Sequence, residues 1–269
     1  MDTGLQEYIK QNYGIDMDEA TTMSELDIVT TLNLRDCYIS HLDLSKFRNV
    51  KILDISYNPI KEIKWGDTSK IEEFSWWGVR MDELDFNLEK FPSLKIVRPG
   101  QDNLTALDFS NNPQIEEILF SISHSLKNLI LPKDCKLKRI NMQGVLIPFV
   151  DLTACNNLEY VNISYWNTFK GKDDVYGDGY PRPFIFVNNQ FSSDVIDSNA
   201  REYEYYCYKL ITVNEASDDL GRMILEKFNG GYVQYLISQI RPSHFGEGIA
   251  KLHYILRQYI SEIKNSDLN

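Results

Sequence analysis

The stretch that decides the fold reads Leu53-Asp54-Ile55-Ser56-Tyr57-Asn58-Pro59-Ile60-Lys61-Glu62-Ile63. It opens with the two-residue alternation of a β-strand, turns, and then brings a second apolar pair. The strand part returns about every 21 residues as a triplet of apolar residues. The triplets are Val29-Leu32-Leu34, Val50-Leu53-Ile55, Ile71-Phe74-Trp76, Leu94-Val97-Pro99, Ile115-Ile118-Phe120, Leu137-Ile140-Met142 and Leu158-Val161-Ile163. A fixed step of this length predicts a solenoid in which each coil buries its apolar residues against its neighbours.

These repeats resemble those of bacterial leucine-rich repeat proteins. The resemblance rests on the stretch quoted above and on Leu104-Thr105-Ala106-Leu107-Asp108-Phe109-Ser110-Asn111-Asn112-Pro113, and the repeats cover about half of the chain. It implies an α/β solenoid with a parallel β-sheet on its concave face, a binding scaffold that carries no chemistry of its own. The family usually places Asn three residues after the last apolar residue of the strand. Only Asn58 fits that position here and Cys37 is an accepted substitute, so the other repeats are expected to turn irregularly.

The pattern divides the chain into an N-terminal cap, the repeats, a loop and a C-terminal region. A helix near residues 3–13 is expected because Leu5, Tyr8, Ile9 and Tyr13 have helical spacing and Gly14 can end it. A later segment rich in Gly, Pro and charge reads as an exposed loop, and amphipathic patterns after it predict helices of no recognisable family. The boundaries are 1–28 for the cap, 29–169 for about seven repeat strands, 170–183 for the loop and 184–269 for a mostly helical cap or subdomain.

Some segments depart from the repeat. Pro99 stands where a strand residue would donate a hydrogen bond, so a distortion is expected near residues 98–101. Residues 184–187 have the composition of a short strand, and residues 203–213 fit either a strand or the start of a helix.

Composition limits the classes of partner. Apolar residues make up 43% of the 269 residues and the net charge is −11, so the chain can bury a core but is poorly suited to nucleic acid or an anionic membrane. No apolar run is long enough to span a bilayer, and the first residues lack the basic and apolar regions of a secretory signal, so we expect a cytoplasmic protein. The acidity either serves solubility or favours a basic protein partner. The oligomeric state is left open.

The residues that most often carry chemistry show no active-site pattern. The four cysteines lack Cys-x-x-Cys spacing, so free, mostly buried thiols are expected, with a disulfide between Cys135 and Cys155 as the alternative. Metal-ligand spacing is lacking among the histidines, which are His41, His124, His244 and His253. Turn capping explains more simply than calcium binding the series Asp43, Asp85, Asp108 and Asp151. We therefore predict no metal, no cofactor and no enzymatic activity.

The repeat register also predicts which side chains face away from the core. In each strand the residues between the apolar ones point outward, where an apolar or aromatic residue has no core to fill. Trp, Tyr and Arg are the commonest anchors of protein interfaces. The predicted partner footprint is therefore Ile52, Asp54, Glu73, Trp77, Ile96, Arg98, Glu117, Leu119, Arg139, Asn141 and Tyr160. Two alternatives stand against it: Trp76 and Trp77 exchange roles, or the C-terminal helices cover this face.

A repeat scaffold with such a face and no catalytic motif predicts non-enzymatic protein–protein recognition. Within that class, a small acidic repeat protein resembles immunity proteins, inhibitors that neutralise a bacterial toxin, and its charge would steer association with a basic toxin or enzyme. The alternative is a secreted bacterial effector whose repeats recognise a host target and whose activity lies in the C-terminal region. A purely adhesive role is a third hypothesis, which normally requires an export signal.

Overall fold

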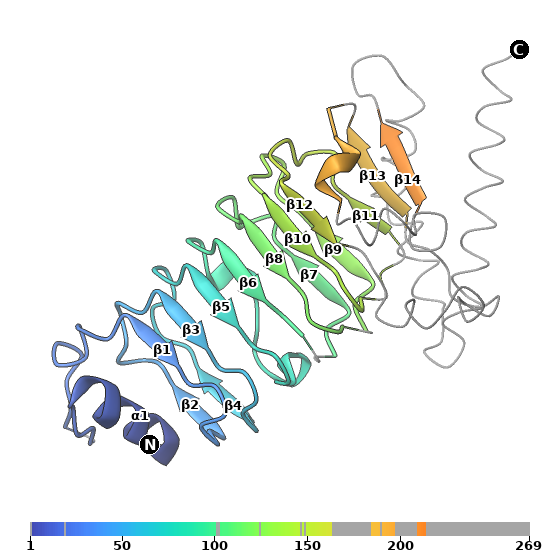
Figure 1. Cartoon of the computed structure of the whole chain (residues 1–269). Helices are drawn as coiled ribbons and strands as arrows, with labels where there is room; N and C mark the ends of the chain where they lie inside the picture. The colour runs from blue at the N-terminus through green and yellow to red at the C-terminus, as the bar shows by residue number, and fades with distance from the viewer. Residues whose placement is uncertain are drawn as a thin grey trace, which may run out of the picture.

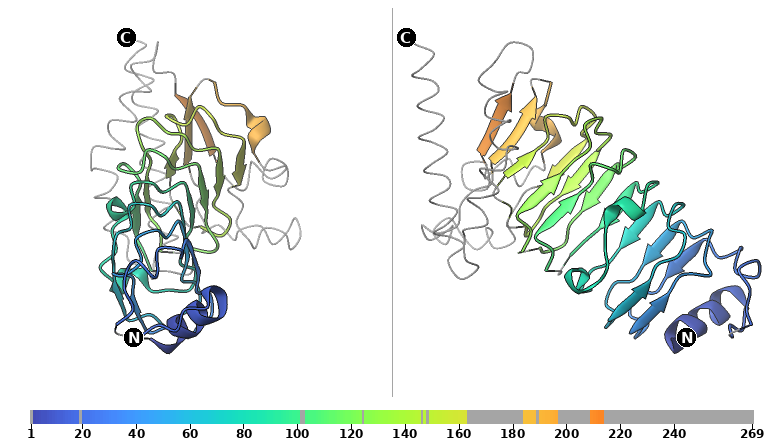
Figure 2. Two further views of the ribbon diagram at one scale, coloured as in Figure 1. Left: turned by 90° about the vertical axis from the view of Figure 1, so that its left-hand side faces the viewer. Right: turned by 180° about the vertical axis from the view of Figure 1, so that it is seen from behind.

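The computed structural model describes residues 2–18, 20–100, 103–123, 125–145, 147, 149–162, 184–188, 190–196 and 209–213. Over these residues the chain winds into a solenoid of short parallel strands, with helix α1 at its N-terminal end (Figure 1). Strands line two opposite sides of the coils, as the views from the end and from behind show (Figure 2). The predicted loop 170–183 and the predicted C-terminal helices lie outside the described residues.

The predicted N-terminal helix is confirmed. Helix α1 spans Thr3–Tyr13 and ends at Gly14, whose φ of 71° is the left-handed conformation that glycine adopts most easily. Leu5 and Ile9 are buried in the same core as the repeats. The apolar stripe of this helix therefore covers the end of the solenoid, which would otherwise expose the first coil.

Asp2 joins this helix to the first coil. One carboxylate oxygen caps the helix by accepting a hydrogen bond from the backbone N–H of Gly4 at 2.9 Å. The other accepts from the N–H of Ser40 at 2.9 Å. Gly4 is required at this junction because a Cβ there would collide with the carbonyl oxygen of Cys37.

The larger side of the solenoid is a parallel sheet of seven strands, which we call the seven-stranded wall. Its order is β1-β3-β5-β6-β8-β10-β12. The strands are β1 (Thr31–Asn33), β3 (Ile52–Asp54), β5 (Glu73–Ser75), β6 (Ile96–Arg98), β8 (Glu117–Leu119), β10 (Arg139–Asn141) and β12 (Tyr160–Asn162). As predicted, their central residues point inward and are fully buried: Leu32, Leu53, Phe74, Val97, Ile118, Ile140 and Val161. Burying each such side chain contributes about 1.5–3 kcal/mol, which fixes the register.

Smaller sheets form the opposite side, which the sequence pattern did not predict as strands. The first pairs β2 (His41–Asp43) with β4 (Glu62–Lys64), the second β7 (Ala106–Asp108) with β9 (Asn128–Ile130), and the third begins with β11 (Phe149–Asp151). Each described central residue is an apolar residue that the repeat pattern places in the core. A strand of three residues offers a single inward residue, so its alternation is too short to distinguish from a turn.

The third coil closes around an aromatic core instead of a strand. Here the chain forms two 3-10 turns, η1 (Met81–Glu83) and η2 (Leu88–Lys90). Phe74 stacks on Phe91 with ring centroids 5.1 Å apart and contacts Trp76 at 4.8 Å. Each such ring pair contributes about 0.5–1.5 kcal/mol beyond burial, which compensates for the missing strand pair.

Every repeat turns in the same way at the end of its wall strand. The turning residue lies two positions after the last inward strand residue and has a φ of 54–74° wherever the structure describes it: Asp36, Tyr57, Gly78, Ile122 and Gly144. The turns are therefore more regular than the sequence predicts. One left-handed residue makes the turn whatever side chain follows it, although non-glycine residues adopt that conformation at a cost.

Pro99 removes one hydrogen bond from the wall. In the first coil the residue at this position donates its N–H to the next coil, as Leu34 does to the carbonyl oxygen of Asp54 at 2.7 Å. Pro99 has no N–H to donate, and the register between β6 and β8 stops one pair short. Pairing resumes between Gly100 and Ser121. The expected distortion is thus one missing rung within the described residues.

The solenoid continues beyond the last predicted repeat. Strand β13 (Phe184–Asn188) pairs with β11, and β14 (Lys209–Val213) pairs with β13, all in parallel. Ile196 follows the 3-10 turn η3 (Ser193–Val195) and bridges to Val161 of the seven-stranded wall. An eighth coil therefore follows the seven that the sequence pattern predicts. The pattern missed it because residues 163–183 interrupt the step of about 21 residues.

The expectation of free thiols is wrong for Cys135 and Cys155, which form a disulfide between neighbouring coils. Both cysteines are buried, so the disulfide lies within the hydrophobic core. Cys37 is free, and burial together with the neighbouring carboxylate of Asp36 raises the pKa of its thiol. Cys207 lies outside the described residues. Structural disulfides are typical of oxidising compartments, so this bond does not favour the expected cytoplasmic location.

Candidate functional site

The predicted footprint lies on the outer face of the seven-stranded wall. The first residues of successive strands pair in register from coil to coil and form one column: Thr31, Ile52, Glu73, Ile96, Glu117, Arg139 and Tyr160. The third residues form a second column: Asn33, Asp54, Ser75, Arg98, Leu119, Asn141 and Asn162. Ile52, Arg98 and Arg139 are exposed. The other predicted footprint residues are half-buried: Asp54, Glu73, Trp77, Ile96, Glu117, Leu119, Asn141 and Tyr160.

The two adjacent tryptophans take the roles that the repeat register predicts. Trp76 is fully buried in the aromatic core. Trp77 directly follows the inward residue and lies on the outside of the wall, half-buried. The alternative in which the two exchange roles is therefore wrong. The other alternative, a cover of C-terminal helices, concerns residues outside those described.

An aromatic cluster with an arginine surrounds Trp77. Its ring meets the ring of Tyr57 edge-on, with centroids 4.5 Å apart. The guanidinium carbon of Arg35 lies 4.4 Å from the centroid of Tyr57 and 5.8 Å from that of Trp77. We call Arg35, Tyr57 and Trp77 the Arg-aromatic cluster. Sequence reasoning missed Tyr57, because its left-handed turn, rather than the strand alternation, aims its side chain toward this face.

Close packing holds Trp77 in place. A Cβ at Gly100 would collide with the edge of the indole, so the ring reaches its position only because this residue is glycine. The backbone N–H of Trp77 donates to the hydroxyl oxygen of Ser56 at 3.0 Å. Among the described residues the buried indole Nε1 has no acceptor, and leaving such a donor unpaired costs about 1–3 kcal/mol. The cluster is therefore built partly at the expense of stability.

The charges on this wall balance. Arg98 and Arg139 of the two columns and Arg35, which follows β1, are basic, and their acidic counterparts are Asp54, Glu73 and Glu117. Arg98 pairs with Glu73 at 3.2 Å, and Arg139 lies over the ring of Tyr160 at 4.8 Å. The outward residues of β2, β4, β7, β9 and β11 include four carboxylates, Asp43, Glu62, Asp108 and Asp151, and one lysine, Lys64. The acidity of the chain is therefore not concentrated on the predicted footprint.

A ladder of alternating charges borders the wall, and the repeat pattern did not predict it. The residue directly before each strand reads, from β3 to β12, Lys51, Glu72, Lys95, Glu116, Lys138 and Glu159. Lys95 contacts Glu72 at 2.6 Å and Lys138 contacts Glu116 at 2.7 Å. These hydrogen bonds lower the pKa of Glu72 and raise the pKa values of Lys95 and Lys138. Exposed pairs contribute little to stability because water screens them, so the ladder chiefly avoids like charges on adjacent strands.

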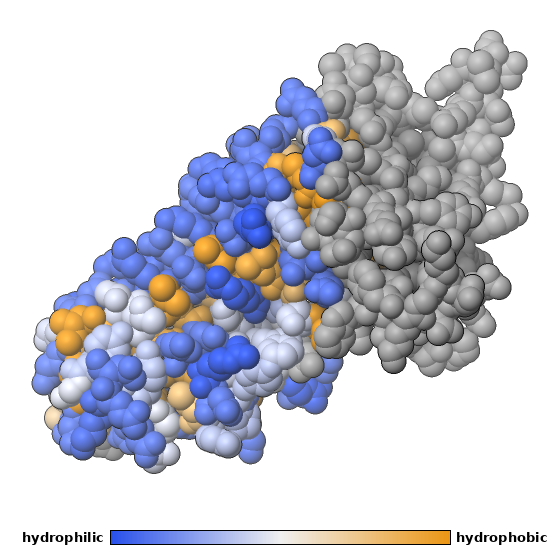
Figure 3. Space-filling model, in the orientation of Figure 1, coloured by the Kyte–Doolittle hydropathy of each residue, from blue (hydrophilic) through white to orange (hydrophobic). Residues whose placement is uncertain are grey.

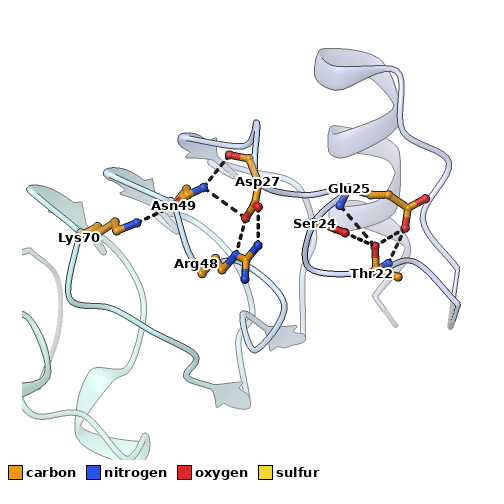
Figure 4. A network of polar contacts seen from close by, with 7 residues as sticks. All are labelled: Thr22, Ser24, Glu25, Asp27, Arg48, Asn49 and Lys70. Carbon is orange, nitrogen blue, oxygen red and sulfur yellow. Dashed lines mark hydrogen bonds and ion pairs between the residues drawn. The ribbon is translucent and has the colours of Figure 1, made fainter.

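A second polar network links the turns of the first three coils (Figure 4). The Nε of Arg48 donates to the Oδ1 of Asp27 at 2.6 Å, and this bond lowers the pKa of the carboxyl group. Asn49 donates to the carbonyl oxygen of Asp27 at 2.9 Å and accepts from Lys70 at 2.7 Å. Since its groups are already paired with one another, we assign this network to holding the coils together.

Several outward side chains of the seven-stranded wall are apolar. Ile52 is 37% exposed, and Ile96 and Leu119 are half-buried on the same face. Apolar patches alternate with polar atoms along the stacked coils in Figure 3. A face of this composition can bind a protein surface, because its apolar residues lose water on contact while its charged residues set the register.

The aspartates of the opposite side serve in turns. Asp43 accepts from the N–H of Ser45 at 2.8 Å, and Asp108 accepts from that of Ser110 at 2.8 Å. Asp151 makes the same bond with Thr153 at 3.0 Å. Asp85 differs, because its carboxylate pairs with Lys90 at 2.7 Å.

Within the described residues, no group of three or more His, Cys, Asp or Glu side chains is placed to hold a metal ion. In the same part of the chain, no helix is long and apolar enough to cross a bilayer.

Comparison with known proteins adds little to this description. No family model and no curated protein matches the chain. Among solved structures, the functional domain of InlJ from Listeria monocytogenes, which includes a cysteine ladder, is similar, with 19% sequence identity and a TM-score of 0.43. The match covers 52% of this chain and 31% of the InlJ chain, so the chain spans about a third of that neighbour.

The structure itself defines the class. Parallel wall strands, coils of about 21 residues with inward apolar triplets, and the buried Asn58 at the turn make this a leucine-rich repeat solenoid. Solenoids of this class commonly serve as scaffolds for protein–protein recognition.

Proposed function

We propose that this protein is a non-enzymatic recognition protein that binds a protein partner through its seven-stranded wall. The observation that carries the proposal is the continuity of this wall, whose seven strands form one sheet, whereas the strands of the opposite side form separate small sheets. The wall presents Ile52, Ile96, Leu119 and Trp77 on its outer face. The opposite side also exposes apolar residues, such as Ala106 and Ile130, but they lie on a separate pair of strands. Water-exposed apolar side chains that line up on one face are typical of a binding surface.

The geometry suggests where binding energy concentrates. Trp, Tyr and Arg dominate interface hot spots, and truncating one typically weakens binding by about 2 kcal/mol or more. Arg35, Tyr57 and Trp77 form such a group at one end of the wall, and Arg139 with Tyr160 forms another near β12. Between them, Ile96 and Leu119 supply apolar contact area. The proposed partner therefore spans several coils.

An inhibitor of a basic toxin is the finer form of this proposal. The net charge of −11 supports it, since an acidic protein attracts a basic partner at long range. The balanced charge of the wall means that this attraction would come from the rest of the surface and would speed association more than it strengthens the final contact. The effector alternative requires activity in residues 184–269, and the few of these that the structure describes are strands and turns of the solenoid.

Site-specific photocrosslinking tests the proposal. A photoreactive residue at Ile52 is compared with one at Ile130, because these isoleucines are 37% and 36% exposed on opposite sides of the solenoid. Both proteins are activated in lysates and media of the source cells and in those of neighbouring species, and adducts are identified by mass spectrometry. We expect a protein adduct from position 52 that is missing from position 130. Adducts from position 130 alone, or none from either, would contradict the proposal.

A further inference from the structure

The Arg-aromatic cluster contains a cation that has no charged partner among the described residues. Arg98, on the same wall, is neutralised by Glu73 at 3.2 Å. Arg35 is exposed and lies over two rings, yet no carboxylate of the described residues comes within ion-pair distance of it. Its guanidinium group is therefore positioned by aromatic faces, which orient it without using its hydrogen-bond donors.

The cluster is also pre-organised at some cost. Tyr57 occupies the left-handed turn position, with a φ of 56°, that Asp36 and Ile122 as well as Gly78 and Gly144 take in other coils. A side chain in this conformation costs about 1 kcal/mol or more. The neighbouring Gly100 leaves room for the indole of Trp77. Side chains that are already fixed in place lose little freedom on binding, so the close packing of these rings favours a binding site.

We propose that the Arg-aromatic cluster binds an acidic linear segment of the protein partner. A Glu or Asp carboxylate of that segment pairs with the planar guanidinium of Arg35, which can donate two parallel hydrogen bonds. An apolar side chain next to the carboxylate rests on the ring of Tyr57, which is 37% exposed. Charge complementarity decides for this occupant, since Arg35 is the cation at this end of the wall that lacks a partner among the described residues.

This inference rests on the proposed function of the wall and makes it more specific. The partner as a whole can be basic or neutral, because the net charge acts at long range whereas the cluster acts on contact. What the cluster requires is one local acidic segment. The anchoring contact is therefore a short motif rather than a property of the whole partner surface.

Selection from a library of random linear peptides tests the inference. The full chain is the bait, and the enriched peptides are synthesised with their acidic residue intact and with Glu or Asp changed to Gln or Asn. We expect a consensus with an acidic residue beside an apolar one. Arg35→Gln should weaken binding of the acidic peptide about ten- to a hundredfold, the loss expected for a hydrogen bond to a charged group. Arg35→Glu should favour the amide version of the peptide over the acidic one.

Two further variants serve as controls. Lys61→Gln removes one positive charge just before β4, on the opposite side, and should leave peptide affinity unchanged. Ile96→Arg alters the wall away from the cluster. Peptides that lack a consensus acid, or that bind Arg35→Gln as well as the natural chain, would overturn the inference, as would no enrichment. If Ile96→Arg loses affinity for the selected peptides and Arg35→Gln keeps it, only this inference fails. If neither variant changes binding, the proposed function of the wall fails with it.

Discussion

Asn58 shows how one side chain joins two coils. Its amide group donates to the carbonyl oxygens of Leu34 at 2.7 Å and Ile55 at 2.9 Å. Its oxygen accepts from the N–H groups of Cys37 at 3.1 Å and Ile39 at 3.0 Å. Backbone groups that a tight turn leaves unpaired are thereby satisfied inside the core. This is the residue on which the sequence resemblance partly rested, and its role follows from the geometry.

The neighbours Trp76 and Trp77 separate stability from binding. We expect Trp76→Ala to lower the free energy of unfolding by about 3–5 kcal/mol, because the side chain is fully buried among other rings. Trp77→Ala should cost clearly less, since Trp77 is half-buried and its indole N–H already lacks an acceptor. Urea denaturation of the natural chain and both variants measures the difference.

In binding, Trp77 is the tryptophan that should matter. Trp77→Ala should weaken the partner by about 2 kcal/mol or more as part of the Arg-aromatic cluster. The conservative variant Trp77→Phe keeps a ring and removes the unsatisfied donor, so it should retain stability and part of the affinity. Equal losses of unfolding free energy for Trp76→Ala and Trp77→Ala would show that both side chains belong to the core.

Residue types alone predicted part of this site. The alternation placed Ile52, Ile96 and Leu119 correctly on the outer face, because strand geometry fixes the side to which each residue points. It did not find Tyr57, whose direction depends on a left-handed turn residue. Nor did it find that Arg35 lies over rings from the next two coils, since contacts between coils depend on how the solenoid stacks. Such contacts are not local properties of the sequence.

At the scale of elements, helix α1 solves the problem of a free sheet edge. Strand β1 begins the seven-stranded wall, and no other strand of the described residues pairs with its outer side. The hydroxyl group of Tyr13 donates to the carbonyl oxygen of Thr31 at 2.7 Å and accepts from its N–H at 3.3 Å. The hydroxyl oxygen of Tyr8 accepts from the N–H of Asn33 at 3.0 Å. Two tyrosines thus occupy the positions that a neighbouring strand would fill, which protects the edge from other chains.

Removing both hydroxyl groups tests this role. In Tyr8→Phe/Tyr13→Phe we expect a loss of about 1 kcal/mol per hydrogen bond and faster hydrogen exchange at the amides of Thr31 and Asn33. The open edge should also promote concentration-dependent self-association, measured by analytical ultracentrifugation. Tyr38→Phe, at a side chain that is 81% exposed, is the matched control. Unchanged exchange at both amides would mean that the tyrosines do not pair with the edge in solution.

The elements of the repeats were more predictable than those between them. Wall strands and α1 follow from apolar spacing, because each buries a regular stripe. The opposite sheets were missed because one inward residue per strand carries no period. Strands β13 and β14 were anticipated only as local composition. Their place in the solenoid depends on pairing with β11 across the interruption at residues 163–183, which no repeat spacing reveals.

For the whole molecule, hydrogen-bonded carboxylates make stability depend on pH. Partial burial opposes ionisation of Asp2, but hydrogen bonds from Ser40, Gly4 and His41 lower its pKa below the ordinary 3.8. The pKa of Asp43 is lowered in the same way, against burial, by Ser45 and Lys64. Since the folded state holds these protons less tightly than the unfolded chain, this stability is present above about pH 4 and is lost as the pH falls through the lowered pKa values.

Denaturation at a series of pH values measures this effect. We expect the free energy of unfolding to fall below about pH 4, and Asp2→Asn to differ from the natural chain most at neutral pH. The difference between the two proteins should shrink as the solution becomes acidic, because Asp2 is then protonated in both the folded and unfolded states. A difference that stays constant down to the acid limit would contradict the role given to the carboxylate.

The central claim is that a partner docks on the seven-stranded wall, and one affinity comparison tests it most directly. Ile52→Arg and Ile130→Arg introduce the same charge at side chains that are 37% and 36% exposed on opposite sides of the solenoid. With the crosslinked partner purified, calorimetric titration should show at least about tenfold weaker binding for Ile52→Arg and unchanged binding for Ile130→Arg. Equal affinities for the two variants, or a loss confined to Ile130→Arg, would contradict the account.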